Sequence, residues 1–278
     1  ILEPQLLGIL CARGEDGKDA IDKFVLIGDH KQLPAVVQQN TEQSAIYDES
    51  LLSIGLTNLK DSLFERLYRN CTATVHRSYD MLCRQGRMHP EVALFANRAF
   101  YGGRLIPVGL PHQIESSDTI CRLAFYPSVP EKVGASAKIN YSEARIVADL
   151  AARIYEDHQT DFDESRTLGI ITPYRSQIAL IKKEIESLGI PALNRILVDT
   201  VERFQGSERD VIIYSFCVNY PYQLKFLSNL TEEEGVLIDR KLNVALTRAR
   251  KQMFITGVSE LLERNPLYKS LLKLIESF

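Results

Sequence analysis

Short apolar runs alternate with longer amphipathic stretches along most of the sequence, and this alternation limits the fold more than any other feature. We predict strands over six apolar runs bounded by polar residues, at 24–27, 121–127, 167–172, 195–200, 210–216 and 252–256. Stretches with apolar residues at helical spacing accompany them, at 61–70, 91–100, 141–157, 176–189, 240–249 and 267–277. Alternating strands and helices are typical of βαβ units, so we predict an α/β fold built on a largely parallel sheet flanked by helices.

The bulk composition limits the class of protein. The 278 residues are 45% hydrophobic and 25% charged, as in globular proteins, and the net charge of −3 argues against indiscriminate binding of polyanions while leaving room for a local basic channel. No apolar run reaches the ~20 residues that span a bilayer, so we expect no membrane partner. The segment "ILEPQLLGIL" has no basic leader and no small-residue cleavage site, so we expect no signal peptide. The five cysteines include no C-x-x-C pair. We therefore expect no zinc site and a reducing compartment, cytoplasmic or, in a eukaryote, nuclear.

Asp29 and Gln32 follow the predicted strand 24–27 in the loop "GDHKQLP". A glutamine amide donates to phosphate oxygens and accepts from water, so Gln32 suits a sensor of a terminal phosphate. The alternative is a polar turn closed by Pro34, because polar loops are mostly solvated connections. The residues alone leave both interpretations open.

Arg87 lies in the segment "QGRMHP", just before a helix that a proline begins. The planar, permanently charged guanidinium binds phosphate through two parallel hydrogen bonds, which suits a clamp on a transferring phosphoryl group. The alternative is an arginine that pairs with a carboxylate beside the helix start. His89 has no partner histidine at ligand spacing, so we expect a structural hydrogen-bonding role for it.

Thr172, Pro173 and Tyr174 end the predicted strand 167–172 at the mouth of the next helix. A hydroxyl, backbone N–H groups and a helix N-terminus together suit a nucleic-acid phosphate. Tyr174 also suits stacking on a base or a sugar. Taken alone, these residues fit a core tyrosine and a helix cap better.

Thr200, Gly206 and Glu208 lie between the predicted strands 195–200 and 210–216. Gly206 lets the backbone approach a ligand closely. Glu208 suits a ribose hydroxyl or an arginine, although a glutamate in a polar loop is usually only solvated.

Arg248 lies near the end of the predicted helix 240–249, beside the strand 252–256. It suits a phosphate ligand, but basic residues at a helix C-terminus also complement the helix macrodipole. Composition does not choose between these roles. We expect these polar clusters to lie beyond the carboxyl ends of the strands, where open α/β sheets bind their ligands.

Five segments, in this order, resemble the motifs of superfamily 1 helicases, most closely the 1B group that includes the nonsense-mediated-decay RNA helicase. They are "GDHKQLP", "QGRMHP" with its following "FYGGRL", "GIITPYRSQ", "DTVERFQGSERDVIIYS" and "RKLNVALTRARKQMFITG". Each segment alone is modest evidence. Their shared order across roughly residues 24–257 makes chance similarity very improbable.

The resemblance implies a pair of RecA-like domains of the P-loop NTPase type, which hold ATP and Mg²⁺ in the cleft between them and carry single-stranded DNA or RNA across both. It assigns catalytic roles to Gln32, Arg87 and Arg248, the first as γ-phosphate sensor and the two arginines as arginine fingers. It assigns the nucleotide site Asp29, Gly206 and Glu208. It assigns contacts with the nucleic-acid backbone to Thr172, Pro173, Tyr174 and Thr200. It implies no metal ligand in this chain.

The sequence departs from the family pattern in two ways. Gly86 stands where the family usually has an aromatic residue that stacks on adenine, which leaves adenine recognition open. The phosphate loop G-x-x-x-x-G-K-[ST] and the acidic D-E-x-x motif do not occur in the sequence. We interpret this chain as one that begins directly after the acidic motif. About residues 1–80 would be the remnant of the first RecA-like domain, about 81–278 would be the second, and the missing domain would be a partner.

Two functions are compatible with these features. The first is the C-terminal half of an ATP-dependent helicase that translocates 5′→3′ on single-stranded nucleic acid and unwinds duplexes, with this chain alone inactive. The second is a non-catalytic module that keeps the fold for nucleic-acid binding or docking. Gln32, Arg87 and Arg248 together favour the motor, because a docking platform needs no phosphate sensor.

Overall fold

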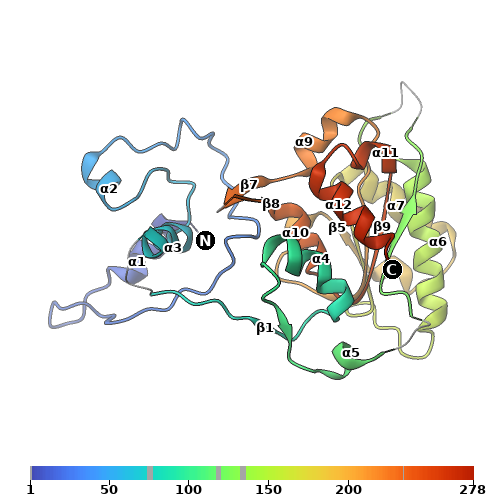
Figure 1. The fold of residues 1–278 in the computed structure, drawn as a ribbon, viewed down its shortest axis with the longest axis horizontal. Coiled ribbons are helices and arrows are strands. Elements are labelled where there is room, and N and C mark those ends of the chain that lie inside the picture. Colours follow the sequence, from blue (N-terminus) through green and yellow to red (C-terminus); the bar gives the residue numbers. More distant parts are fainter. Residues whose placement is uncertain (1, 74–77, 117–119, 132–135, 234) are drawn as a thin grey trace. The chain divides into compact units, whose positions relative to one another are not determined.

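Figure 1 shows the fold in a computed structural model, which describes residues 2–73, 78–116, 120–131, 136–233 and 235–278. The chain divides into two compact units, residues 1–82 and 83–278, which are described separately below. The assignment of residues 1–80 and 81–278 to a first and a second RecA-like domain stays a prediction.

The first unit consists of helices joined by irregular segments. Its helices are α1 (Glu3–Leu10), α2 (Glu49–Ser53) and α3 (Leu63–Ala73), the last of which corresponds to the predicted helix 61–70. Arg66 of α3 forms a buried ion pair with Glu3 of α1, in which Arg66 Nε donates to Glu3 Oε2 at 2.8 Å. Because an unpaired buried charge is costly, this pair fixes α3 against α1.

The strand predicted over residues 24–27 is wrong. This segment is irregular, and the side chains of Val25 and Ile27 are 85% and 87% exposed. A strand satisfies its backbone N–H and C=O groups by pairing with a neighbour. Among the described residues of the first unit, no strand is available to pair with it. An apolar run is therefore not enough to form a strand here.

The second unit is built on five strands that are all parallel. In chain order they are β3 (Leu123–Pro127), β4 (Leu168–Ile171), β5 (Leu197–Asp199), β6 (Arg209–Ser215) and β9 (Ala249–Gly257). Their order across the sheet is β3-β9-β6-β4-β5. The predicted α/β fold and its parallel sheet are confirmed. The central strands β6 and β4 read as continuous apolar runs because helices cover both faces of the sheet.

Helices pack on both faces of this sheet (Figure 1). One face carries α6 (Tyr141–Asp157) and α7 (Arg175–Ser187), and the other carries α4 (Pro90–Phe100), α10 (Arg240–Leu246) and α12 (Pro266–Ile275). The apolar face predicted for residues 141–157 comprises Val147, Leu150, Ala151, Ile154 and Tyr155, of which the first four are buried and Tyr155 is half-buried. Asn140 begins α6, because its side chain accepts a hydrogen bond from the Glu143 N–H at 2.8 Å.

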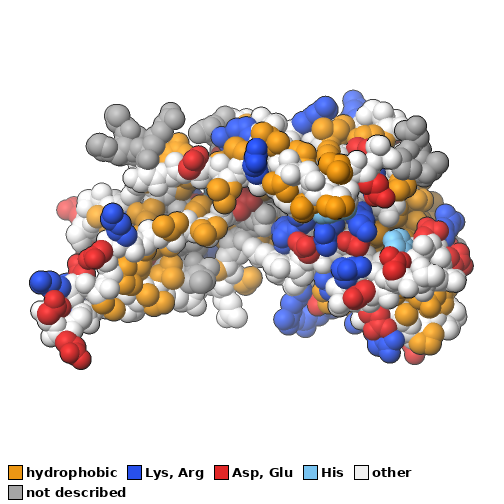
Figure 2. Space-filling model, turned by 90° about the horizontal axis from the view of Figure 1, so that it is seen from below, with side chains coloured by type: hydrophobic (Ala, Val, Ile, Leu, Met, Phe, Trp, Pro, Cys, Tyr) orange, Lys and Arg blue, Asp and Glu red, His pale blue; other side chains and the backbone are white. Residues whose placement is uncertain are grey.

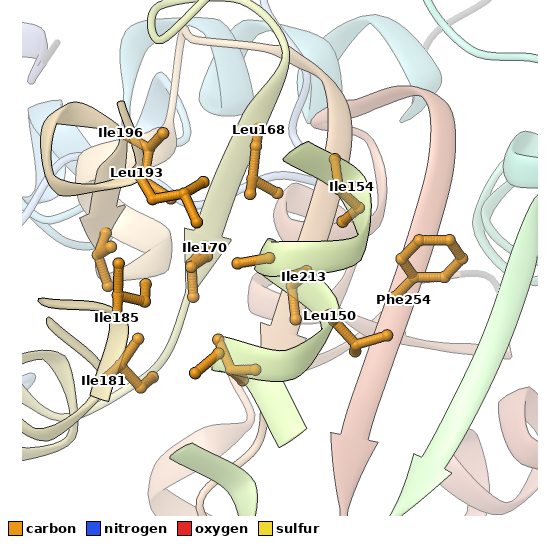
Figure 3. Packing of buried hydrophobic residues seen from close by; sticks show 14 of the residues in the cluster. Leu150, Ile154, Leu168, Ile170, Ile181, Ile185, Leu193, Ile196, Ile213 and Phe254 are labelled. Carbon is orange, nitrogen blue, oxygen red and sulfur yellow. The ribbon is translucent and has the colours of Figure 1, made fainter. Parts of the chain in front are cut away.

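The main core lies between the sheet and the pair α6 and α7. Figure 3 shows Leu150 and Ile154 of α6 beside Leu168 and Ile170 of β4, with Phe254 of β9 at the side. Alternate residues of each strand enter this layer, as the two-residue repeat of a strand requires. Burial of this layer fixes the relative positions of the strand ends, which carry the polar side chains considered below.

Shorter elements complete the second unit. They are the strand pairs β1 (Arg84–Gln85) with β2 (Ile106–Pro107) and β7 (Leu230–Glu233) with β8 (Val236–Asp239), the helices α5 (Pro111–Ile114), α8 (Val201–Phe204), α9 (Leu224–Leu227) and α11 (Ser259–Leu262), and the 3₁₀ turns η1 (Leu193–Arg195) and η2 (Pro221–Gln223). Within the described ranges, no helix combines the length and the apolar character that crossing a membrane requires.

The Ile170→Ala substitution tests this core, since the Ile170 side chain is fully buried in the middle of β4. We expect the free energy of unfolding to fall by about 2–5 kcal/mol, from lost transfer energy and the cavity left behind. The matched control is Ile106→Ala, at a side chain that is 55% exposed, with an expected change within about 0.5 kcal/mol. Urea unfolding followed by far-ultraviolet circular dichroism measures both. Equal shifts in the two variants would contradict the packing described.

Candidate functional site

Arg87 and Glu208 form an ion pair at the amino-terminal edge of the sheet. Arg87 lies between β1 and α4, and Glu208 directly precedes β6. Arg87 Nε donates to Glu208 Oε2 at 2.5 Å, and Arg87 Nη1 donates to the carbonyl of Thr247 at 3.2 Å. The side chains are 35% and 42% exposed, so the pair is open to solvent. The contact joins three sequence segments that lie far apart in the chain.

The neighbouring arginines keep the Glu208 carboxyl negatively charged. Partial burial acts to raise the pKa of the Glu208 carboxyl, but the hydrogen bond and charge of Arg87, with the charges of Arg250 and Arg248, outweigh it and hold that pKa below its ordinary value. Glu208 is therefore an anion at neutral pH that holds several arginines at one place.

The loop that carries Arg87 is held from two sides. Gln113 of α5 donates from Nε2 to the carbonyls of Gln85 and Met88, at 2.9 and 3.0 Å, and His112 lies 2.8 Å from the Arg87 carbonyl through Nε2. This support limits the freedom of the Arg87 backbone, so its guanidinium is positioned by a rigid loop.

His89 has the structural role expected for it. Its Nδ1 accepts a hydrogen bond from the Glu91 N–H at 3.3 Å at the start of α4, and its Nε2 lies 3.2 Å from the Glu115 carbonyl. Burial, with the nearby charge of Arg122, lowers the pKa of His89. The ring therefore acts as a neutral cap of α4.

Arg248 lies at the same edge of the sheet but is only 3% exposed. Its Nε donates to the Val244 carbonyl at 3.1 Å, its Nη1 to the Ser207 carbonyl at 3.3 Å, and its Nη2 to Thr247 Oγ1 at 3.2 Å. These contacts tie the end of α10 to the connection before β6. The structure thus brings Arg87, Glu208 and Arg248 together, while their roles in a nucleotide site stay a prediction.

The helix before Arg248 is anchored by a buried carboxylate. Asp239 caps α10 by accepting a hydrogen bond from the Lys241 N–H at 3.0 Å, and Tyr268 Oη of α12 donates to Asp239 Oδ2 at 2.9 Å. Burial raises the pKa of Asp239, and hydrogen bonds from the backbone and Tyr268 act against that rise. The cap fixes the start of α10 and, through this helix, the position of Arg248.

A second group of charges borders the ion pair, and sequence reasoning did not identify it. Asp210 Oδ1 lies 3.6 Å from Arg250 Nη1, and its Oδ2 lies 3.2 Å from Lys251 Nζ and 3.9 Å from Arg166 Nε. Figure 2 shows acidic and basic side chains interleaved on this face of the second unit. The sequence contains the opposite charges of "ERD" and "RARK". Their contact could not be predicted without knowing that the two strands that carry them are neighbours in the sheet.

A bulge in β9 explains how two successive basic residues reach one carboxylate. Along the β6–β9 pair, Arg209 lies opposite Ala249 and Val211 lies opposite Gln252, so β9 holds one residue more than β6 in this interval. Successive side chains of a regular strand point to opposite faces, and an extra residue breaks that alternation. Arg250 and Lys251 therefore both approach Asp210.

These charges line a hollow of about 570 Å³. The residues around it are Leu110, Pro111, His112, Glu115, Arg166, Asp210, Arg250 and Lys251. The hollow therefore holds both signs of charge, because Arg166, Arg250 and Lys251 all lie beside the carboxylate of Asp210.

Gly206 forms the turn that leads the chain into β6. Its φ of +89° lies in the left-handed region that only glycine adopts readily, while the space around its Cα is open. The glycine is therefore required here by the backbone turn, and the open space beside it is compatible with the predicted approach of a ligand.

The other predicted contacts lie at the opposite edge of the sheet. Thr172 directly follows β4 and Thr200 directly follows β5, and the Thr172 N–H donates to the Asp199 carbonyl at 3.1 Å. Tyr174 begins α7, and its hydroxyl accepts a hydrogen bond from Gln223 Nε2 at 3.2 Å. Thr172, Pro173, Tyr174 and Thr200 are therefore brought together at the carboxyl edge, as expected.

The expectation that all polar clusters lie at the carboxyl edge is wrong for one group. Arg87, Glu208 and Arg248 lie at the amino ends of β6 and β9. The reason is topological, because "VERFQGSER" returns from the carboxyl end of β5 to the amino end of β6 before Glu208 is reached. Thr172 also differs from a surface ligand, since it is fully buried and its hydroxyl makes no hydrogen bond within the described structure.

Beneath this carboxyl edge lies a buried acid that sequence reasoning missed. Glu143, in the first turn of α6, is fully buried and accepts hydrogen bonds from Ser215 Oγ at 2.6 Å, the Cys217 N–H at 2.8 Å and Ser128 Oγ at 3.4 Å. Burial raises its pKa to about 7, and the hydrogen bonds act against that rise. It joins the ends of β3 and β6 to α6.

In the first unit, Gln32 and Asp29 lie together. Gln32 Nε2 donates to Asp29 Oδ2 at 3.0 Å, and the Lys31 N–H donates to Asp29 Oδ1 at 3.0 Å. The amide of Gln32 is thus oriented by its own loop. Its predicted meeting with Arg87 and Arg248 around a nucleotide stays a prediction.

Comparisons with known proteins identify a family model and several relatives that match this chain. The family model described as "AAA domain" matches residues 59–260. Regulator of nonsense transcripts 1 of Dictyostelium discoideum is 32% identical over 264 residues, covering 90% of this chain and 18% of its own length. The DNA replication ATP-dependent helicase/nuclease DNA2 of Xenopus laevis is 30% identical over 279 residues, covering 87% and 23%. The chain therefore spans less than a quarter of either relative.

A third relative and a solved structure add detail. Helicase sen1 of Schizosaccharomyces pombe is 28% identical over 270 residues, covering 92% of this chain and 14% of its own length. The C-terminal domain of a possible DNA helicase from Lactobacillus plantarum covers 63% of this chain and 88% of its own, with 14% identity and a TM-score of 0.36. That structural likeness is too low to add to the assignment.

The buried acid gives a pH-dependent prediction. The pKa of Glu143 is about 7 when folded against an ordinary 4.5, so its contribution to stability is complete below about pH 4.5 and is lost as the pH rises through about 7. Relative to Glu143→Gln, which keeps hydrogen bonds with its neighbours, the wild type should lose on the order of 2 kcal/mol between about pH 5 and about pH 8. Urea unfolding at both pH values measures this loss. The control Glu156→Gln, at an exposed position of the same helix, should run parallel to wild type. Equal changes in unfolding free energy between the two pH values in wild type and Glu143→Gln would contradict the prediction.

Proposed function

We propose that this chain, which belongs to the AAA domain family and is a helicase-like region of superfamily 1, is the second half of an ATP-dependent nucleic-acid motor. The motor translocates 5′→3′ along single-stranded DNA or RNA and unwinds duplexes. The observation that carries the proposal is the meeting of Arg87, Glu208 and Arg248 at one edge of the sheet.

In this proposal the nucleotide lies against the amino edge of the sheet. Arg87 has a resting partner in Glu208 and is exposed enough to exchange that carboxylate for a phosphate oxygen. Glu208 then accepts hydrogen bonds from the ribose hydroxyls, and Gly206 leaves room for the sugar. Guanidinium groups fixed before the reaction stabilise charge on the transferring phosphoryl group without reorganisation during it.

In this proposal, other parts of the polypeptide supply the rest of the nucleotide site. Residues 1–80 belong to the first RecA-like domain, and Gln32, oriented by Asp29, senses the γ-phosphate. ATP, when bound, supplies the phosphoryl group, with Mg²⁺ held mainly by the phosphate-loop domain. Within the described ranges, no three His, Cys, Asp or Glu side chains form a group that could hold a metal ion.

The nucleic-acid strand lies at the opposite edge, against Pro173, Tyr174 and Thr200. Thr172, which is buried, contributes by holding the end of β4 to β5. Since β4 is hydrogen-bonded to β6, whose amino end carries Glu208, the two ligands are joined by one packed sheet. When nucleotide binding shifts this unit, its contacts with the nucleic-acid strand therefore shift with it.

The burial of Arg248 favours the second candidate function, a non-catalytic docking module. Its guanidinium donates to the carbonyls of Val244 and Ser207, which is a structural arrangement. A finger must reach phosphate oxygens, so the motor requires the Arg248 side chain to leave these carbonyls when nucleotide is bound. Substitution of Arg248 separates the two functions.

We expect Arg248→Ala to lower ATP turnover by about a thousandfold or more, because an arginine finger supplies much of the charge stabilisation in phosphoryl transfer. The measurement is strand-stimulated ATP hydrolysis by a polypeptide that carries a phosphate-loop domain together with this chain. Arg87→Ala should fall to a similar extent. Arg195→Ala, at an exposed surface ion pair with Glu164, is the matched control and should retain turnover. Full turnover in Arg248→Ala would favour the docking module.

The 278-residue chain by itself should release no phosphate from ATP, because its sequence contains no G-x-x-x-x-G-K-[ST] loop to hold the β- and γ-phosphates. A coupled phosphate-release assay with single-stranded nucleic acid present measures this. The Arg248→Ala variant of the same chain serves as the background control. Hydrolysis that disappears in this variant would show that the chain is complete as a catalyst.

A further inference from the structure

Three aromatic rings lie together on the surface between β6 and β7. They belong to Tyr220, Tyr222 and Phe226, in the segment that includes η2 and α9. The rings of Tyr220 and Tyr222 are stacked, with centroids 5.7 Å apart and an interplanar angle of 14°. Phe226 meets Tyr222 edge-on at 6.5 Å and 81°. Tyr222 and Phe226 are 54% and 68% exposed, so more than half of the surface of each residue is open to water.

The backbone that carries the rings is held firmly from below. Gln223 is buried, and its Oε1 accepts hydrogen bonds from the N–H groups of Asn219 and Tyr220, both at 2.9 Å. Leu224 and Leu227 turn the apolar side of α9 into the core. The rings are therefore displayed by a fixed frame, which lowers the entropy lost when a ligand packs against them.

The same glutamine joins the rings to the proposed strand contact. Gln223 Nε2 donates to Tyr174 Oη at 3.2 Å and to the Ala137 carbonyl at 2.7 Å. Tyr222 precedes Gln223 in the chain. The segment that carries the rings is thus linked to Tyr174 through Gln223, and it follows the carboxyl end of β6.

Basic residues lie in the chain segments that contact the ring-bearing segment. Lys138, Arg175 and Lys225 are exposed, and Ser176 Oγ donates to the Lys138 carbonyl at 2.9 Å, which holds Lys138 beside the start of α7. Acidic side chains are present as well: Glu131 is half-buried and accepts a hydrogen bond from the Tyr141 N–H. Glu202 lies 3.1 Å from Lys241 Nζ, which donates to the Phe226 carbonyl at 3.5 Å. Basic groups beside exposed rings suit a ligand that carries both phosphates and flat apolar groups.

We propose that Tyr220, Tyr222 and Phe226 form a stacking platform for unpaired bases of a single nucleic-acid strand. The proposal rests on the proposed function, since it extends the strand path beyond Tyr174. Every base has a ring face, so the platform binds without regard to sequence. It would hold the strand by its bases, in contrast to the backbone contacts assigned to Pro173, Tyr174 and Thr200.

The experiment compares two labelled strands of the same length, roughly twelve nucleotides, which lies inside the range that single stacking modules bind. One strand is oligothymidylate, and the other is the same backbone without bases. Binding to the full chain is followed by fluorescence anisotropy at low salt. The variants are Phe226→Ala and Tyr222→Ala, both at exposed positions, with thermal unfolding as the check that the fold is intact. Tyr222→Phe keeps the ring, and Leu230→Ala removes an apolar side chain that is 49% exposed on β7.

The expected result is a loss of about tenfold in affinity for oligothymidylate in each alanine variant and no change for the abasic strand. Tyr222→Phe and Leu230→Ala should bind both strands as the wild type does. Equal binding of both strands by wild type, unchanged in the alanine variants, would overturn the platform and leave the backbone contacts standing. The same result is expected if the rings serve a protein partner. Failure of wild type to bind either strand would overturn the platform together with the nucleic-acid half of the proposed function.

Discussion

The pairing of β6 with β9 is the interaction on which the rest of the structure depends. It places the connection 205–208 beside the segment 247–251, and these two segments supply Glu208, Arg248 and Arg250. The same pair lies at the centre of the sheet, with β3 outside β9 and β4 outside β6. Without it, the basic residues at the end of α10 would have no carboxylates to oppose them.

Two sets of polar side chains lie at opposite ends of these strands. Arg87, Glu208 and Arg248 gather at the amino edge, whereas Tyr174 and Thr200 lie at the carboxyl edge. Between them, β4, β6 and β9 are each hydrogen-bonded to a strand on both sides and are largely buried, and close-packed interiors transmit displacement with little compression. In the proposed motor this sheet acts as a stiff body that links nucleotide and strand.

The sequence predicted the five strands of the main sheet well, because each is a short apolar run that finds a sheet partner, whereas the short strand pairs β1 with β2 and β7 with β8 were not predicted. The run 24–27 has the same composition and forms no strand, since composition does not report whether a partner exists. The parallel direction of the strands was predicted from the alternation of strands and helices in the sequence. The amino-edge position of Arg87 and Glu208 did not, because it depends on which strand lies next to which.

Burial of single polar groups was the hardest feature to predict. Glu143 lies in the first turn of a helix, where an acid is normally an exposed partner of the helix dipole, yet it is fully buried among groups from three chain segments. The role of Arg248 in a nucleotide site stays a prediction, and its burial against carbonyl groups was not foreseen. Both facts arise from tertiary packing, which leaves no local pattern in the sequence.

The additional residue in β9 has a consequence for how this part of the chain can vary in length. Removing one residue between Ala249 and Gln252 would restore regular pairing with β6 and turn the preceding side chains to the other side of the strand. Arg248 would then be displaced from its carbonyl acceptors even though its codon was untouched. Insertions and deletions at this junction are therefore as consequential as substitution of the arginines themselves.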